Sequence, residues 1–306
     1  MTAYQHRIVL PPDYPGCTVR EQLQAWWIPK KWQHFLRIED GVLVNGRYQS
    51  MNTRLHAGDL VSLAFTHVDH PVQDYNVTAR SSLVICHEDP DVLVVDKPAG
   101  EKMHPNHAGE SNTLMNAAAS YLAASGGAAF MVHRLDQATS GAVLIAKNPA
   151  VVPPLNRQLA IKTLHREYLA VVPGTPVLPD HGHFTGPIAH AINDVRRRTV
   201  DNKNGQAADT EFRVLDRSSE TQLLLLTLHS GRTHQIRVHL AHAGLPIIAD
   251  PLYGPAAAAD QIPEDEMLLH AWRLTWATPL GFGTQTATAP IPARFRPYLR
   301  AWPAYR

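Results

Sequence analysis

The sequence is poor in several features that mark large classes of protein. It has two cysteines, Cys17 and Cys86, far apart in 306 residues, so neither a disulfide scaffold nor a cysteine-rich zinc site is indicated. The longest apolar stretch, around Leu223–Leu228, has the length of a strand and not of a membrane span. The N-terminus lacks the basic-then-apolar pattern of a signal peptide. We therefore expect a cytoplasmic protein with reduced thiols and no membrane partner.

An excess of positive charge is also missing. The formal net charge is +1 and charged residues make up 18% of the chain, so composition alone does not indicate a nucleic-acid-binding protein. The cations are unevenly placed, however, because Lys30, Lys31 and Arg37 cluster early and residues 196–198 are all arginine. Either group could contact phosphates, although a solvated surface is the more common meaning of such a run.

The chain length suits two domains, and 24 prolines indicate many loops. We expect a small domain over 1–75 and a larger one over 80–306, joined by a polar linker around 71–79. Apolar periodicity predicts the following elements of the small domain: helices at 19–27 and 30–39, strands at 42–44 and 60–64, and an Asn45-Gly46 hairpin turn. The larger domain is expected to open with a hairpin of strands 83–86 and 92–95.

One short stretch of the larger domain, residues 133–141, has the sequence HRLDQATSG. It places Asp136 in a loop just before an apolar run at 142–146. Enzymes often place a nucleophile or a general base in such a position. From the residues alone, Asp136 capping the turn through a side-chain oxygen is the more common alternative.

A second stretch, residues 230–240, reads SGRTHQIRVHL. It predicts a turn followed by a helix that is capped by Thr233 and closed by Gly244. On that helix His234 and Arg237 are three residues apart and share a face. The spacing of His234, His239 and His242 does not match a helical zinc site, and no cysteine accompanies them, so we expect no metal.

The first stretch resembles the HRLDxxTSG motif of the RluA family of pseudouridine synthases. Four further segments resemble that family's motifs in the same order, so that the likeness spans roughly residues 80 to 300: DKPAG from Asp96, REYLA from Arg166, GRTHQIRVH from Gly231 and LHAWRL from Leu269. The segments IEDGVLVNG and LHAGDLV are similar to the small RNA-binding domain named after ribosomal protein S-four. The whole pattern is RluD-like.

The resemblance implies a fold and an activity. The fold is α+β, with a mixed, mainly antiparallel central sheet and flanking helices, preceded by a small N-terminal α/β domain of RNA-binding type. The implied activity is isomerisation of specific uridines to pseudouridine in structured RNA, with large-subunit ribosomal RNA favoured over transfer RNA as partner. No cofactor is implied, because the reaction is internal to one nucleotide. We expect a monomer.

The resemblance also implies roles for individual residues. Asp136 is the catalytic carboxylate, acting either as a nucleophile at the sugar or as a base for its 2′ hydrogen. Arg237 pairs with Asp136, and Tyr168 stacks on the uracil, although a strand tyrosine is in general more often part of a core. Arg134 reaches the RNA where the base leaves the stack. The other candidate RNA contacts are these: His133, Thr139, Arg232, His234, Lys30, Lys31 and Arg37.

Two other classes of function remain open from the residues. A glycoside hydrolase would also use a carboxylate, but such enzymes use a pair, and the second stretch contains no acid. A catalytically inactive RNA-binding protein is the other alternative. The presence of Asp136, Tyr168 and Arg237 argues against this inactive alternative.

Overall fold

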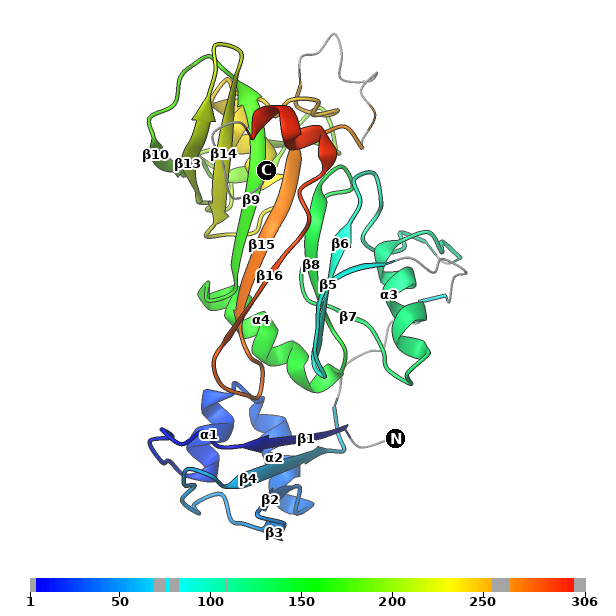
Figure 1. Cartoon of the computed structure of the whole chain (residues 1–306), viewed down its shortest axis with the longest axis vertical. Coiled ribbons are helices and arrows are strands. Elements are labelled where there is room, and N and C mark those ends of the chain that lie inside the picture. The colour runs from blue at the N-terminus through cyan, green and yellow to red at the C-terminus, as the bar shows by residue number, and fades with distance from the viewer. Residues whose placement is uncertain are drawn as a thin grey trace.

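The computed structural model describes residues 4–68, 75–76, 83–107, 109–254, 263 and 265–299. Figure 1 shows a small N-terminal unit, drawn in blue, below a larger unit rich in strands. Of the linker expected at 71–79, only Tyr75 and Asn76 belong to the described residues. Among the helices within those residues, none combines the length and the apolar character that a membrane span requires.

The small unit pairs two helices with a four-stranded antiparallel sheet of order β1-β4-β2-β3. Its elements are β1 (Tyr4–Val9), α1 (Val19–Ala25), α2 (Lys30–Ile38), β2 (Val42–Val44), β3 (Arg47–Tyr48) and β4 (Leu60–Phe65). Thr18 and Glu21 form a reciprocal capping box that starts α1. Asn45 and Gly46 both have positive φ, 51° and 77°, as a two-residue hairpin turn requires. The expected helices and turn are confirmed, whereas β1 and β3 were not predicted.

The larger unit is built on one ten-stranded sheet. Its strands are β5 (Val84–Glu88), β6 (Val92–Lys97), β7 (Phe130–Met131), β8 (Ser140–Ala146), β9 (His165–Pro173), β10 (His181–Phe184), β13 (Thr210–Arg217), β14 (Thr221–Leu228), β15 (Leu269–Ala277) and β16 (Thr284–Thr288). The main order is β10-β13-β14-β9-β15-β8-β6-β5, with β16 paired to β15 and β7 to β8. Between these strands, β8 and β15 pair in parallel and the other pairs are antiparallel. The predicted mixed, mainly antiparallel α+β sheet is confirmed.

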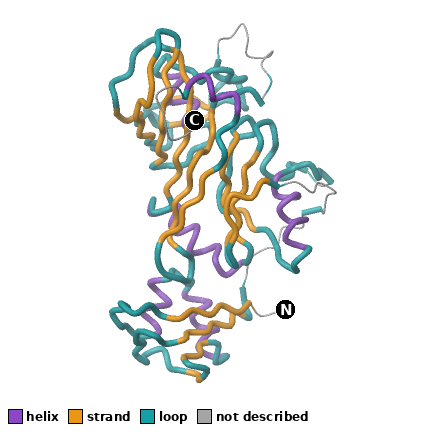
Figure 2. The backbone as a smooth tube through the Cα atoms, viewed as in Figure 1, coloured by secondary structure: helices purple, strands orange, loops and turns teal. Residues whose placement is uncertain are grey.

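Helices lie at the edges of this strand-rich unit, as Figure 2 shows. They are α3 (Leu114–Ala123), α4 (Val152–Ile161), α5 (Gln235–His242) and two short 3₁₀ turns, Pro149–Val151 and Ala293–Tyr298. A separate hairpin of β11 (Ile188–His190) and β12 (Arg198–Val200) carries the arginine run at its end. Helix α4 begins before Pro154, because proline fits the first turn, where its missing N–H leaves no hydrogen bond unmade.

The central strands are buried on both faces, which explains their apolar runs. Every residue of β8 is buried, and so are residues 168–172 of β9. One apolar cluster covers the face that carries α3 and α5, and a second cluster covers the opposite face. Because both clusters hold the same strands, the loops at the strand ends have rigid supports.

The second cluster continues into the small unit. It contains Trp26 and Leu63 of the small unit together with Trp276 and Leu280 of the large one. The Trp26 indole donates a hydrogen bond to the carbonyl oxygen of Gly281 at 3.1 Å. The sheets of the two units are separate, but the apolar core is shared. Removing the small unit would therefore expose part of the core of the large one.

Candidate active site

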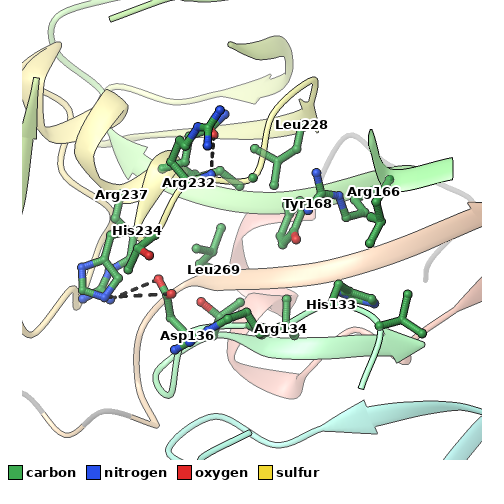
Figure 3. A pocket seen from close by; sticks show the side chains of 18 of the residues that line it. His133, Arg134, Asp136, Arg166, Tyr168, Leu228, Arg232, His234, Arg237 and Leu269 are labelled. Atoms are coloured by element: carbon green, nitrogen blue, oxygen red, sulfur yellow. Dashed lines mark hydrogen bonds and ion pairs between the residues drawn. The ribbon is translucent and has the colours of Figure 1, made fainter. Parts of the chain in front are cut away.

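Three elements meet around one pocket of about 490 Å³. The loop between β7 and β8 supplies Asp136, the start of α5 supplies Arg237, and strand β9 supplies Tyr168. Figure 3 shows these side chains directed toward the same space. The structure therefore brings together the three residues to which the sequence assigned catalysis, although they are far apart in the chain.

The Asp136 loop is held by backbone contacts. The N–H of Thr139 donates to the carbonyl oxygen of Asp136 at 3.1 Å, which closes the turn. The ammonium of Lys97, fully buried, and the N–H of Gly100 both donate to the carbonyl oxygen of Gln137, each at 2.9 Å. The turn is thus closed by the carbonyl of Asp136. Its carboxylate is directed toward α5 and is not the cap that the residues alone favoured.

Gly141 lets the loop enter the sheet. Its φ is +116°, and a Cβ built on it would lie 2.1 Å from the carbonyl oxygen of Ala271. This close approach occurs where β8 runs parallel to β15, with Gly141 opposite Ala271. No side chain fits there, so the last position of the HRLDxxTSG motif requires glycine for steric reasons.

The carboxylate of Asp136 is half enclosed between two basic side chains. Its Oδ2 accepts from Nη1 of Arg237 at 3.4 Å, and its Oδ1 lies 3.9 Å from Nε2 of His234. The side chain of Asp136 is 19% exposed, so it can reach a ligand in the pocket. The guanidinium thus holds the carboxylate in a fixed orientation toward the pocket.

Arg237 has a second and closer partner that the sequence reasoning missed. Its Nε and Nη2 donate to the two oxygens of Asp250 at 2.8 and 2.7 Å, and the Asp250 side chain is fully buried. Burial alone would raise the pKa of Asp250, but the hydrogen bonds from Arg237 hold it below its ordinary value. Asp250 therefore fixes the guanidinium that faces Asp136.

The second stretch itself contains no acid, as the sequence indicated, but the fold brings Asp250 to it. Asp250 lies in the continuation IIADPLYG, and an acid 13 residues after Arg237 was the available signal. Besides Arg237, Oδ1 of Asp250 accepts the N–H groups of Leu252 and Tyr253. A fully buried carboxylate occupied in this way cannot serve as the second acid of a glycoside hydrolase.

The start of α5 differs from the prediction. The helix begins at Gln235, and its N-cap is His234, in the left-handed region with φ 60°, and not Thr233. Instead of a cap, the Gln235 side chain organises the turn, because its oxygen accepts from Ser230 Oγ and from the N–H of Arg232. The left-handed backbone directs His234 toward Asp136. Such strain at a non-glycine residue is typical of functional sites.

The ring of His234 is held by Tyr253. Its Nδ1 lies 2.9 Å from the Tyr253 hydroxyl, which also accepts the N–H of Arg198 at 2.8 Å. Burial lowers the pKa of His234 below its ordinary value, while Asp136 acts in the opposite direction. The arrangement that satisfies all three groups has Tyr253 donating to Nδ1, which leaves the ring proton on Nε2, facing Asp136.

Tyr168 lines the pocket from the floor. It lies opposite Ala271 of β15 and Leu226 of β14, and it is 4% exposed. Burial raises the pKa of its phenol, so the hydroxyl is protonated at neutral pH. A buried aromatic face beside a carboxylate suits stacking against a planar base.

The pocket is strongly positive although the chain is nearly neutral. Five cationic side chains and one carboxylate line it: Arg134, Lys162, Arg166, Arg232 and Arg237, with Asp136. Arg134 is exposed at the mouth, and Arg232 donates from Nη1 to Gln206 at 2.8 Å. The local charge suits a polyanion, which the overall charge did not indicate.

His133 and Thr139 also line the pocket, but both are buried. The Nε2 of His133 accepts the N–H of Leu144 at 2.9 Å, which fixes the tautomer and holds the loop against β8. Burial, with a smaller contribution from Arg166, lowers the pKa of His133 to about 3, so the ring is neutral. These contacts hold the loop against β8, and contact of His133 or Thr139 with RNA stays a prediction.

Two other groups lie outside the pocket. Lys30, Lys31 and Arg37 are exposed on α2 and none of them lines it.

Both ring nitrogens of His239 are hydrogen-bonded, to Thr210 and to the carbonyl of Gly186, so it is not arranged as a metal ligand with His234. A different group, His183, Asp209 and His229, brings donor atoms within 4.8 Å of one another on partly exposed strand ends.

Comparisons with known proteins agree with this arrangement. A model of the family described as RNA pseudouridylate synthase matches residues 91–242, and one of the RluD ribosomal pseudouridine synthase N-terminal domain matches residues 6–61. An uncharacterized RNA pseudouridine synthase of Bacillus subtilis, YlyB, is 36% identical over 247 residues, covering 79% of this chain and 76% of the relative.

Two further comparisons extend this likeness. Ribosomal large subunit pseudouridine synthase D of Nitrosomonas europaea is 36% identical over 227 residues, covering 72% of this chain and 65% of that protein. Among solved structures, human RNA pseudouridylate synthase domain containing 1 superposes with a TM-score of 0.58 at 25% identity. That superposition covers 72% of this chain and 87% of the human one.

Proposed function

The chain belongs to the RNA pseudouridylate synthase family, and on this premise we propose that it converts specific uridines of large-subunit ribosomal RNA to pseudouridine with Asp136 as the catalytic carboxylate. The preference for ribosomal RNA is supported by relatives named ribosomal large subunit pseudouridine synthase D and by the matching N-terminal domain. Transfer RNA is the alternative substrate.

The observation that carries the catalytic role is the isolation of one reachable carboxylate. Asp136 is the only acid that lines the described pocket, and it lies between Arg237 and His234. A nucleotide whose base rests on Tyr168 would present its sugar toward that carboxylate. Asp136 then either attacks C1′ or removes the 2′ hydrogen, while Arg237 keeps the carboxylate oriented.

The remaining pocket cations receive binding roles in this proposal. Exposed Arg134 lies at the mouth of the pocket and Arg232 on its rim, positions suited to contact the RNA strand as the uridine leaves its stack. His234 faces one oxygen of Asp136 and Arg237 the other, so both side chains orient the carboxylate. His133 and Thr139 hold the loop.

Replacing the carboxylate tests the catalytic role. Asp136→Asn keeps the shape of the side chain but removes its charge, so we expect pseudouridine formation to fall by at least about 10³-fold. RNA affinity and the unfolding midpoint should stay close to the wild-type values. Asp89→Asn, in the β5–β6 turn away from the pocket, is the matched control and should retain activity. Wild-type turnover in Asp136→Asn would refute the assignment.

The RNA target is tested by mapping. Pseudouridines are located in total RNA from cells with and without the gene, and each missing site is then restored with purified protein. We expect the lost sites in large-subunit ribosomal RNA. Loss confined to transfer RNA would select the alternative substrate, and loss at no site would contradict the proposal.

We propose further that residues 1–75 and 80–306 act as two domains and that α2 binds RNA through Lys30, Lys31 and Arg37. The support is their exposure on one helix of a domain matched to ribosomal pseudouridine synthases. Deletion is a poor test because the core is shared. The triple change to glutamine should weaken RNA binding and lower its salt dependence by up to about three charges. The change Arg47→Gln on β3 serves as the control.

We also propose that the enzyme acts as a monomer in the cytoplasm. The pocket gathers Asp136, Arg237 and Tyr168 from a single chain, which is what a monomeric enzyme requires. The cytoplasmic assignment rests on the proposed RNA substrate. Light scattering at assay concentration should give a mass near 33.9 kDa, and activity per chain should not change on dilution.

A further inference from the structure

Arg166 is a buried cation without an acidic partner among the described residues. It lies on β9, lines the pocket and is 8% exposed. Its Nη2 donates to the carbonyl oxygen of Ser230 at 3.1 Å, and its Nε has no hydrogen-bond partner. A buried guanidinium without a counter-ion is costly, and proteins normally pair or neutralise such a charge.

The other buried cations of the site are satisfied. Arg237 is paired with both oxygens of Asp250, and the ammonium of Lys97 donates to three carbonyl oxygens. Arg166 is the exception among them. The fold therefore tolerates at this point a charge that it compensates elsewhere, which indicates that the compensating group arrives with a ligand.

The surroundings of Arg166 favour an anion. Lys162 and Arg232 line the same end of the pocket. Burial lowers the pKa of Lys162, and the neighbouring charges of Arg166 and Arg232 lower it further. No carboxylate lines this end, because the single lining acid, Asp136, lies against Arg237 and His234. The local field thus attracts negative charge.

The geometry relates this cation to a nucleotide. Arg166 and Tyr168 are two residues apart on one strand, so their side chains leave the same face, about 7 Å apart along β9. Figure 3 shows them next to one another in the pocket. This separation is comparable with that between a base and a phosphate of the same nucleotide.

Gly231 keeps room for the guanidinium. A Cβ on Gly231 would lie 3.0 Å from Nη1 of Arg166, so a side chain there would force the guanidinium to shift. Gly231, the first residue of the GRTHQIR motif, therefore leaves the space that the guanidinium of Arg166 occupies. The positions of Gly231 and Arg166, 65 residues apart, are linked only in the folded protein.

We propose that Arg166 binds a backbone phosphate that flanks the uridine held on Tyr168, with Lys162 and Arg232 contributing charge at the rim. The guanidinium presents N–H donors in a planar fork that matches two phosphate oxygens. This inference rests on the proposed function, since it assumes that the pocket holds a nucleotide of RNA. It adds a binding site that the family motifs did not assign.

The first test uses inorganic phosphate as the probe. Thermal unfolding of the full chain is compared in phosphate and in chloride at equal ionic strength. We expect phosphate to raise the wild-type midpoint by about 2–4 °C. Arg166→Gln should lose this rise, because the shorter amide side chain carries no charge. In chloride its midpoint should equal or exceed that of the wild type, because an uncompensated charge has been removed.

Two further variants make the result specific. Lys162→Gln removes one exposed charge from the same end of the pocket and should retain most of the phosphate response. Gly231→Ala should weaken the response with Arg166 still present, because its Cβ forces the guanidinium to shift. An unchanged phosphate response in Arg166→Gln, or no response in the wild type, would overturn the proposal. A midpoint in chloride more than about 5 °C below that of the wild type would show instead that the guanidinium is structural.

The second test uses ribosomal RNA and separates this inference from the proposed function. Arg166→Gln should raise the KM for RNA by about tenfold while kcat stays within about threefold, because the phosphate is bound before and during the reaction. A fall in kcat with unchanged KM would contradict the phosphate site. If the wild type modifies no ribosomal RNA, the proposed function fails, whereas the phosphate comparison still decides the role of Arg166.

Discussion

The two ends of the pocket use arginine in opposite ways. At the α5 end, Arg237 is held by both oxygens of Asp250 and faces Asp136. At the β9 end, Arg166 has one carbonyl contact and an unpaired Nε. An arginine that must orient a protein carboxylate is fixed by another carboxylate. An arginine that must receive a ligand is left uncompensated, at a cost in stability.

Removing Asp250 would break this contrast most severely. Asp250→Ala leaves Arg237 buried beside vacated space, so we expect the free energy of unfolding to fall by about 3–5 kcal/mol and activity to be lost. Denaturant unfolding and a pseudouridine assay measure the two effects. The double variant Asp250→Ala, Arg237→Met should regain stability but not activity. If Asp250→Ala were as stable as the wild type, the pair would not be what fixes Arg237.

Acid should lower the stability of the folded protein, because His133 is buried in a neutral form near Arg166. The pKa of His133 is about 3 in the folded protein, against an ordinary value of 6.5. Between these values the unfolded chain binds the proton and the folded chain does not, so stability falls as pH falls from about 6.5 toward 3. The slope approaches about 1.4 kcal/mol per pH unit for this group.

The matched variant for this prediction is His133→Gln, whose amide oxygen can accept the N–H of Leu144 without titrating. Urea unfolding between pH 7 and pH 4 should show a shallower decline for the variant. His270, also with a pKa of about 3, remains in both proteins and supplies the residual slope. Identical slopes would show that His133 is not neutral in the fold.

Tyr253→Phe tests whether the α5 end depends on more than the arginine pair. The change leaves the N–H of Arg198 and the Nδ1 of His234 without the hydroxyl, so we expect a loss of about 1–3 kcal/mol and a lower kcat. Tyr121→Phe, whose exposed hydroxyl bonds Glu88, is the control and should change stability by less than about 0.5 kcal/mol. A kcat equal to that of the wild type would remove His234 from the orientation of Asp136.

Ala249→Gly should have the smallest effect and the opposite sign. Ala249 precedes Asp250 with φ 59°, a conformation that glycine adopts without strain. We expect a gain of about 0.5–1 kcal/mol in unfolding free energy and unchanged activity. Ala243→Gly, at φ −77° after α5, should lose stability instead. A loss in Ala249→Gly would mean that the methyl group packs usefully.

Much of the fold followed from local patterns. Apolar runs bounded by turns predicted the hairpin of β5 and β6, and Asn45-Gly46 predicted its turn. The start of α5 was predicted wrongly, because threonine is a common N-cap residue and Thr233 was therefore taken as the cap. The tertiary contacts of Gln235 with Ser230 and Asp209 override that propensity and leave His234 in the left-handed region.

The members of the candidate site and the pairing of Arg237 with Asp136 were predicted, whereas the contacts of Arg237 with Asp250 and of His234 with Tyr253 were not. Asp136, Tyr168 and Arg237 were identified from motifs, and the structure gathers them around one pocket. The charge balance was misjudged because composition sums over the whole surface, whereas the pocket concentrates cations. Asp250 was overlooked because an acid directly before a proline looks like an ordinary turn residue until its partner is known.

The sequence by itself determined which side chains are available and the local elements that carry them, because periodicity and turn chemistry act over a few residues. Only the tertiary structure decided which charges compensate one another. Asp250 neutralises Arg237 because the segment after α5 returns to the helix, and Arg166 stays unpaired because strands β14 and β15, its neighbours in the sheet, bring it no acid. Such pairing depends on strand order and burial, which lie beyond any local pattern.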